Sequence, residues 1–188
     1  MIEWNNKAIT KGFSPMRPDP SVHSEHTGSM QKDDCSDKEN KELQRAEAKA
    51  MQFLLYRQRT EKELREKLRE KEFSSEAVEN AVAYVKSFGY LDDRKYAEVY
   101  LHSQKTKKGR AVIRRELQEK GVDSEWIDLA FEEEPEDGGE IIYTLLCKRA
   151  GEPHELEEKE LRRHVQYLAR KGFPVSEIWK QVRRYQES

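Results

Sequence analysis

The sharpest chemical signal in this chain is a short basic turn. Lys105, Lys107, Lys108 and Arg110 place four cations within six residues, around Gly109. Clustered lysine and arginine side chains bind phosphates or carboxylates, so the natural partners are a nucleic-acid backbone or an acidic groove on a protein. No aromatic side chain is interleaved in the cluster for stacking on bases, so we expect no sequence-specific base recognition.

Other basic residues alternate with apolar ones along the chain. Charged residues are common on any exposed helix face, so each alone is weak evidence for a binding site. Lys71, Lys120 and Lys171 recur at one repeat position, although a cation near a helix C-terminus also suits the helix dipole. The candidates for a partner-binding or DNA-binding face are Arg65, Arg69, Lys71, Lys105, Lys107, Lys108, Arg110, Arg114, Arg115, Lys120, Arg162, Arg163, Arg170, Lys171, Arg183 and Arg184.

The sequence offers little catalytic or metal-binding chemistry. It contains neither a Walker-type glycine loop nor a G-x-G-x-x-G motif. His23, His26 and Cys35 lack the second ligand pair that zinc sites use. Asp92 and Asp93 suit the start of a helix better than a metal site or an acid pair. We therefore expect no catalytic residue, no metal, no cofactor and no enzymatic activity.

The composition indicates small helical modules rather than one large core. Of the 188 residues, 35% are hydrophobic and 38% are charged, which is apolar-poor for a soluble domain. No apolar run approaches the roughly 20 residues of a membrane span, and the N-terminus does not resemble a secretory signal. Cys35 and Cys147, the two cysteines, do not form a disulfide framework. We expect a monomeric, cytoplasmic protein with no membrane partner.

Charge is sorted into blocks along the chain. The formal net charge is only −2, which argues against a general nucleic-acid binder. Residues 94–121 nevertheless carry a balance of +6 and residues 159–188 a balance of +5, whereas residues 122–158 carry −11. Such sorting can create a basic patch on a nearly neutral protein.

Three stretches of the sequence repeat one another. Leu68, Leu117 and Leu168 each stand three residues before a lysine, and they are 49 and 51 residues apart. A period of about 50 residues indicates a repeat protein whose stacked units form an elongated body. The pattern predicts an all-α fold of three tandem three-helix repeats in an elongated, curved array, with boundaries at residues 46–91, 92–135 and 136–188.

Local signals mark where the predicted helices start and stop. Thr60 and Glu63 form a capping box, in which Glu63 would return a bond to the amide of Thr60. Ser74 or Ser75, an aspartate at 92–93, and Asp123 would cap later helices. Gly89 suits the left-handed conformation that follows a helix end. Residues 1–45, rich in proline and polar residues, are predicted to be a low-complexity, largely disordered tail.

Several segments closely resemble the RecX family of recombination regulators. They are TEKELREKL at 60–68, FGYLDDRKYA at 88–97, the pair GR at 109–110 leading into IRREL at 113–117, and KGV at 120–122. The resemblance covers about residues 46–188. It implies tandem three-helix repeats without enzymatic activity that bind the groove of the RecA filament on single-stranded DNA. It further implies restraint of the ATPase, strand-exchange and coprotease activities of RecA in recombination and the SOS response.

The resemblance also implies which surface would meet the filament. By this likeness the basic residues of the second and third repeats would face it, and the third repeat is the more diverged. They are Lys105, Lys107, Lys108, Arg110, Arg114, Arg115, Arg162, Arg163, Arg170, Lys171, Arg183 and Arg184.

One alternative from a different class stays open. The chain could bind single-stranded or double-stranded DNA directly, without a recombinase. That function predicts steeply salt-dependent binding to naked nucleic acid, whereas a filament ligand binds tightly only when the recombinase is present.

Overall fold

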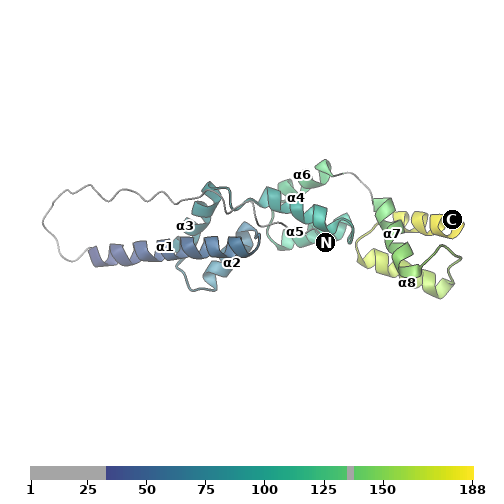
Figure 1. The fold of residues 1–188 in the computed structure, drawn as a ribbon, viewed down its shortest axis with the longest axis horizontal. Coiled ribbons are helices and arrows are strands. Elements are labelled where there is room, and N and C mark those ends of the chain that lie inside the picture. The colour runs from purple at the N-terminus through teal and green to yellow at the C-terminus, as the bar shows by residue number, and fades with distance from the viewer. Residues whose placement is uncertain (1–32, 135–137) are drawn as a thin grey trace.

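The described part of the chain is helical throughout and falls into three groups of helices. The structure is a computed structural model and describes residues 33–134 and 138–188. Within these ranges there are nine helices and no strand, and Figure 1 shows them as three groups in a row along the long axis. Each group has its own hydrophobic cluster. The predicted all-α class and elongated arrangement of three-helix units are confirmed.

The first unit contains α1 (Asp33–Tyr56), α2 (Glu61–Arg69) and α3 (Ser75–Ser87). Their buried apolar residues recur at intervals of three and four, so each helix turns one stripe inward. Leu64 and Leu68 of α2 are fully buried between α1 and α3. Because the helices are short, most of their stability comes from this shared stripe rather than from helix propensity.

The start of α1 corrects one prediction. Residues 33–45 were assigned to the low-complexity tail, but they form the first part of α1. This stretch has few apolar residues, yet most of residues 38–45 are Lys, Glu, Leu, Gln or Arg, which are strong helix formers. Leu43 packs on the first core, and the Glu42 carboxylate accepts a hydrogen bond of 2.7 Å from the amide of Ser74. The rest of the predicted tail, residues 1–32, lies outside the described residues.

The second unit contains α4 (Asp93–Gln104), α5 (Arg110–Glu119) and α6 (Ser124–Glu133). Ile113 and Leu117 of α5 are fully buried against α4 and α6. Since α5 offers only this narrow apolar stripe, its remaining faces are free to carry charge.

The third unit contains α7 (Gly138–Ala150), α8 (Glu158–Arg170) and α9 (Val175–Glu187). Tyr185 of α9 is fully buried, and its hydroxyl donates to the carbonyl of Glu152 at 2.8 Å. That bond fastens the α7–α8 loop to the core of the unit. The predicted boundary between the second and third units, at residues 135 and 136, lies outside the described residues.

Two of the predicted caps, Ser74 and Asp92, form, whereas Asp123 precedes α6 without a side-chain cap hydrogen bond. Ser74 accepts from the amide of Ala77 at 3.3 Å, and Asp92 accepts from Lys95 at 3.0 Å. Thr60 accepts from the amide of Glu63 at 3.2 Å, but Glu63 does not return the bond. Its carboxylate is drawn instead to Lys120 of the second unit, whose Nζ lies 2.6 Å from Oε1. The capping box is therefore half formed because an ion pair between units competes for Glu63.

The junction between the first and second units joins the two middle helices. The hydroxyl of Thr60 donates to the carbonyl of Lys120 at 2.6 Å. Lys62 Nζ donates to the carbonyl of Glu119 at 3.0 Å, and the Asp93 carboxylate accepts from the amide of Glu61 at 2.9 Å. The start of α2 is thus bound to the end of α5 and the start of α4.

The junction between the second and third units uses the same repeat positions. Gly109, like Thr60, stands eight residues before its repeat leucine, and Lys171, like Lys120, stands three residues after. The amide of Gly109 donates to the carbonyl of Lys171 at 2.8 Å. The start of one middle helix therefore contacts the end of the next at both junctions. Because both acceptors are backbone carbonyls, this contact does not by itself explain the recurrence of lysine.

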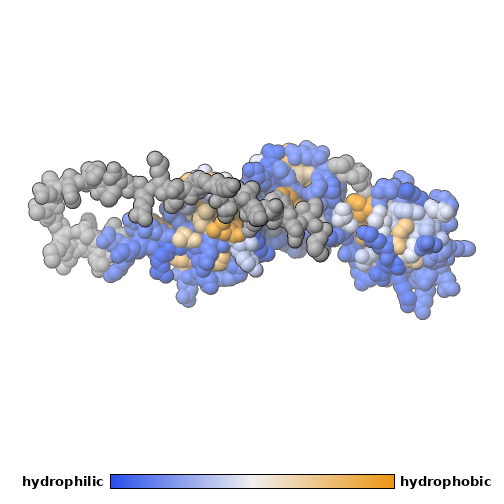
Figure 2. Space-filling model, in the orientation of Figure 1, coloured by the Kyte–Doolittle hydropathy of each residue, from blue (hydrophilic) through white to orange (hydrophobic). Residues whose placement is uncertain are grey.

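The surface of the array is mainly hydrophilic. Figure 2 shows hydrophilic residues over most of the visible face, with apolar colour confined to small patches. This pattern follows from the narrow apolar stripes, which leave most of each helix in water. On the visible face, charged and polar side chains are therefore the main groups that a partner could contact.

Candidate functional site

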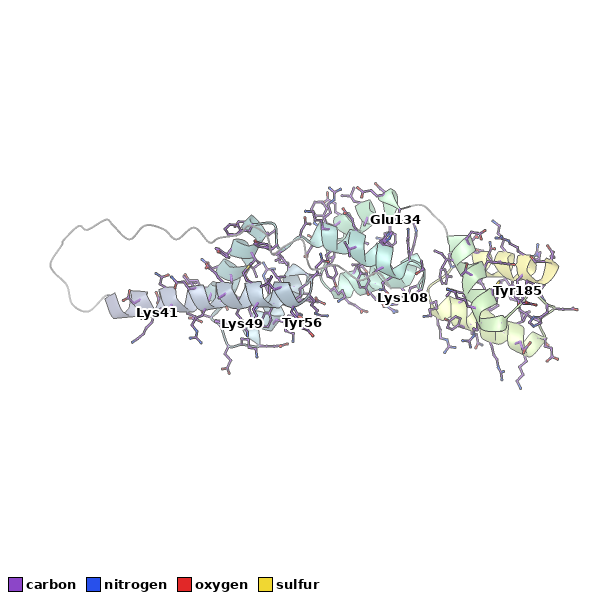
Figure 3. All side chains as sticks on the ribbon, in the orientation of Figure 1. Lys41, Lys49, Tyr56, Lys108, Glu134 and Tyr185 are labelled. Carbon is purple, nitrogen blue, oxygen red and sulfur yellow. The ribbon has the colours of Figure 1, made fainter. Side chains whose placement is uncertain are left out.

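The predicted basic turn of the second unit is held by the acidic segment that ends α6. Lys105 Nζ lies 2.5 Å from Oε2 of Glu134, and His102 Nδ1 lies 3.2 Å from Oε1 of the same carboxylate. The guanidinium of Arg110 donates to the carbonyl of Glu134 at 2.8 Å. Figure 3 labels Glu134 and Lys108 in the second unit. The acidic block therefore folds back on the basic block and neutralises part of it.

A second carboxylate takes up another cation of the turn. Lys108 Nζ lies 2.6 Å from Oε1 of Glu116, and the hydroxyl of Tyr100 donates to Oε2 at 2.8 Å. Burial alone would raise the pKa of Glu116, but the bonds from Lys108 and Tyr100 outweigh it and the pKa is lowered. Burial, followed by the charge and hydrogen bond of Glu116, raises the pKa of Tyr100. Lys108 is thus part of a satisfied network.

The arginines of α5 are also engaged within the unit. Arg114 Nη1 lies 2.6 Å from the carboxylate of Asp128, and its guanidinium stands 5.2 Å from the ring centre of Phe131. Arg115 makes a looser contact, with Nε 3.6 Å from the Glu119 carboxylate, and stays exposed. Lys107 is exposed and no described residue accepts from its ammonium.

The predicted arginines of the first unit share one carboxylate. Glu79 on α3 lies 3.0 Å from Arg65 and 3.7 Å from Arg69, and Arg65 also contacts Glu61 at 2.6 Å. Lys71 is exposed and has no polar partner among the described residues. Its repeat equivalent, Lys120, instead faces the first unit through Glu63.

The basic residues of the third unit divide into paired and unpaired ones. Arg162 pairs with Glu158, and Arg184 Nη1 lies 2.5 Å from Glu140. Arg170 donates to the carbonyl of Gln166 at 3.4 Å, and Lys171 stands over the ring of Tyr167 at 5.5 Å. The exposed residues without a polar partner among the described residues are Arg163 and Arg183.

The structure thus divides the predicted basic face into two groups of cations. In most predicted positions the cation already binds a carboxylate, a carbonyl or an aromatic ring of the same molecule. Within the predicted basic face, the exposed cations that no described polar group binds are spread over all three units and define what we call the free cations: Lys71, Lys107, Arg163 and Arg183. An external anion can reach these residues without displacing an internal partner.

A groove lies at the junction between the second and third units. Its volume is about 650 Å³. Its lining includes the apolar residues Leu101, Ile113 and Phe173 and the cations Lys105 and Arg110. Lys105 is paired with the Glu134 carboxylate, and Arg110 donates to the Glu134 backbone carbonyl.

Among residues 33–134 and 138–188, the acidic, histidine and cysteine side chains form no cluster that could hold a metal ion. None of the helices in that part of the chain is long and apolar enough to cross a membrane.

The ion pair of Glu134 predicts an acid-sensitive contribution to stability. The hydrogen bond from Lys105 lowers the pKa of this carboxyl and outweighs its partial burial. A lowered folded-state pKa stabilises the fold fully above the ordinary value of 4.5, and that stability is lost as pH falls through the lowered value. In urea unfolding, we expect the free energy of unfolding to fall less steeply below about pH 4.5 in Glu134→Gln than in the parent. Glu132→Gln, at an exposed position of α6, should match the parent, and equal slopes for all three proteins would contradict the prediction.

The sequence matches models of two RecX domains. Residues 46–84 match the first three-helix domain of RecX, and residues 92–130 match the second. The matched segments coincide with most of the first two units, and the start of α1 lies before the first match.

Curated relatives extend the likeness over most of the chain. The regulatory protein RecX of Vibrio vulnificus (strain CMCP6) is 34% identical over 130 residues, which cover 69% of this chain and 85% of that protein. The regulatory protein RecX of Bacillus velezensis is 33% identical over 145 residues, covering 73% of this chain and 54% of that protein. The chain therefore spans most of the Vibrio relative but about half of the length of the Bacillus one.

Solved structures agree with the sequence match. A crystal structure of regulatory protein RecX superposes with a TM-score of 0.71 at 25% identity, covering 86% of this chain and 81% of that chain. RecX from Lactobacillus salivarius, at 23% identity and a TM-score of 0.66, covers 79% of this chain and 99% of that chain and shares the fold. With its matching domains, its relatives and its three-helix units, the chain belongs to the RecX family of regulatory proteins.

Proposed function

We propose that the chain is a non-catalytic regulator that binds the RecA recombinase filament on single-stranded DNA. In this role it restrains the ATPase, strand-exchange and coprotease activities of the filament in recombination and the SOS response. The observation that carries the proposal is the row of three units, each presenting at least one free cation. The site of action would be the cytoplasm.

The linear arrangement suits a repeating partner. Three units linked in a row can contact successive protomers, and each contact raises the effective concentration of the next. Contacts that are individually weak then sum to a useful affinity. A ligand that bridges protomers and prefers one filament state shifts the population toward that state, so turnover slows without contact with the ATP site.

The pairing of the second unit's cations favours a protein filament over a bare polyanion at that unit. Lys105 and Lys108 already neutralise Glu134 and Glu116. A phosphate chain bound there would have to displace these carboxylates, which reduces the gain from releasing its counterions. A structured acidic surface can instead place its carboxylates against the exposed Lys107 alone.

The function is tested by titrating the purified protein into RecA, ATP and single-stranded DNA. We expect ATP hydrolysis and strand exchange to fall at concentrations stoichiometric with the filament. Co-sedimentation with and without the recombinase reports whether the filament, rather than the DNA alone, is the partner. Unchanged hydrolysis and strand exchange at stoichiometric protein would rule the proposal out.

The free cations provide a sharper test than the whole basic face. We expect glutamate substitutions at all four to weaken inhibition by tenfold or more, since each lost ion pair at an interface costs about 0.5–1 kcal/mol. These side chains bind no described polar group, so circular dichroism and thermal unfolding should match the parent. The variant carries Lys71→Glu, Lys107→Glu, Arg163→Glu and Arg183→Glu.

A matched control carries the same change of charge at other exposed lysines. Glutamate substitutions at Lys95, Lys148, Lys159 and Lys180 change the net charge equally. We expect this control to inhibit the recombinase nearly as well as the parent. Equal loss in both variants would mean that net charge, and not the free cations, governs the effect.

A further inference from the structure

The structure places a second basic surface on α1, partly in the stretch predicted to be a tail. Lys41, Arg45 and Lys49 follow one another at intervals of four residues. At 100° and 1.5 Å per residue, they fall within about 80° of the helix circumference and about 6 Å apart along its axis. Figure 3 shows Lys41 and Lys49 in succession along this helix.

The positive charge of this stripe is not neutralised by the rest of the molecule. Lys41 and Arg45 are exposed, and no described residue pairs with either side chain. Lys49 donates to the neutral side chain of Gln52 at 2.7 Å and stands 5.3 Å from the ring centre of Phe53, and no described carboxylate pairs with it. This contrasts with Lys105, whose partner is a carboxylate.

The packing of α1 leaves the stripe facing solvent. Ala46 and Ala50 are fully buried, and on a helical wheel they lie about 100° or more from the middle of the stripe. Glu42, at the edge of the stripe, uses its carboxylate to accept from the amide of Ser74 at the start of α3. Asp37 stands four residues before the first lysine of the stripe and is exposed, and no ion pair joins it to that lysine among the described residues. The core therefore occupies the other side of the helix, and Glu42 directs its carboxylate to the start of α3.

An exposed aromatic residue continues the stripe. Tyr56, the last residue of α1, follows Lys49 by seven residues, so it lies two turns further on the same side. It is 84% exposed, and its neighbour Leu55 is 73% exposed. Large side chains this open at the end of a cationic row are available for stacking.

We propose that this stripe of α1 binds single-stranded nucleic acid, with the three cations on successive phosphates and Tyr56 stacked on a base. A groove or row of positive charge combined with an aromatic platform is the usual way in which proteins bind single strands. A duplex hides the faces of its bases and cannot use Tyr56. An anionic membrane surface would require an outward apolar face, whereas the apolar face of α1 is buried.

The surface lies partly outside the family likeness. Lys41 and Arg45 precede residue 46, where the match to the first RecX domain begins. The contact needs no recombinase, so it stands or falls independently of the proposed filament function.

The test measures binding of a fluorescent oligothymidylate of about 20 nucleotides by anisotropy, without recombinase, between about 50 and 200 mM salt. Three phosphate contacts predict a log–log salt slope of about −2 for a single strand. Glutamine at Lys41, Arg45 and Lys49 should remove most of that slope and weaken binding at least tenfold at about 50 mM salt. Tyr56→Ala should weaken binding about fivefold or more and leave the slope unchanged, because stacking carries no charge.

The control substitutes glutamine at Lys148, Lys159 and Lys180 of the third unit, which removes the same charge from exposed positions. We expect it to bind as the parent does, with helical circular dichroism intact in every variant. Equal loss in the control, equal affinity for a duplex, or equal competition by polyglutamate would overturn the proposal, as would binding to anionic vesicles alone. The recombinase ATPase assay on the same variants separates this contact from the filament function.

Discussion

Gly109→Ala should destabilise the protein by about 2–4 kcal/mol, because the substitution forces backbone against backbone at the junction of the second and third units. A Cβ at Gly109 would lie 2.2 Å from the carbonyl oxygen of Gly172 and 2.7 Å from the amide of Phe173. Neither atom can move without shifting a helix end, and the 2.8 Å hydrogen bond from Gly109 to Lys171 would be strained as well. In thermal unfolding the midpoint should fall by roughly 5–15 °C.

Gly138→Ala is the matched control for this substitution. A Cβ at Gly138, the first residue of α7, meets nothing within 4 Å. We expect that variant to unfold within about 0.5 kcal/mol of the parent. If Gly109→Ala and Gly138→Ala had the same unfolding temperature, the close contact at the junction would not be formed in solution.

Thr60→Val should cost about 2–3 kcal/mol by releasing the junction between the first and second units. The side chain is fully buried, and its hydroxyl makes two bonds. It donates to the Lys120 carbonyl at 2.6 Å and accepts from the Glu63 amide at 3.2 Å. Valine has nearly the same shape but leaves both groups without their partner, so the loss combines a helix cap with an unsatisfied carbonyl.

The variant Thr60→Ser distinguishes the contribution of the hydroxyl group to stability from that of the methyl group. Serine keeps both hydrogen bonds and loses one buried methyl, so its cost in urea unfolding should stay near 1 kcal/mol. Hydrogen exchange would add a local reading, with faster exchange expected at the end of α5 only in the valine variant. Valine and serine variants of equal stability would contradict a structural role for the hydroxyl.

Much of the fold could be predicted because its signals are local. Leu68, Leu117 and Leu168 repeat at a fixed spacing, and all three are essentially buried in their units. Gly89 has a φ of 70°, in the left-handed region that suits glycine after a helix end. Such signals depend only on residues within one or two helical turns, so the sequence contains them in full.

The start of α1 could not be predicted from apolar spacing. Its first part contacts the core through few residues, and one of its anchors is the bond from the Ser74 amide to Glu42, 32 residues earlier. The spacing of Lys41, Arg45 and Lys49 was present in the sequence. This spacing places the three cations on one side of the chain only if the stretch is a helix.

The sequence predicted which basic residues make up the candidate site, but not which of them are left unpaired by the fold. The sequence identified Lys105 and Lys120 as candidates for binding a partner, yet both meet carboxylates of the same chain. Glu134 lies 29 residues from Lys105, and Glu63 lies 57 residues from Lys120. No described residue pairs with the side chain of Lys107. In the sequence, however, Lys107 could not be distinguished from its basic neighbours.

The sequence by itself determined the helical class, the three units, most caps and the family, since helix periodicity and capping act over a few neighbouring residues. The tertiary structure alone decided which cations are neutralised, which face the solvent, and how one unit meets the next. These outcomes depend on distances between residues far apart in the chain, such as Thr60 and Lys120, 60 positions apart and joined by one hydrogen bond. Coulombic and hydrogen-bond energies follow spatial distance, which the fold sets and the local pattern does not contain.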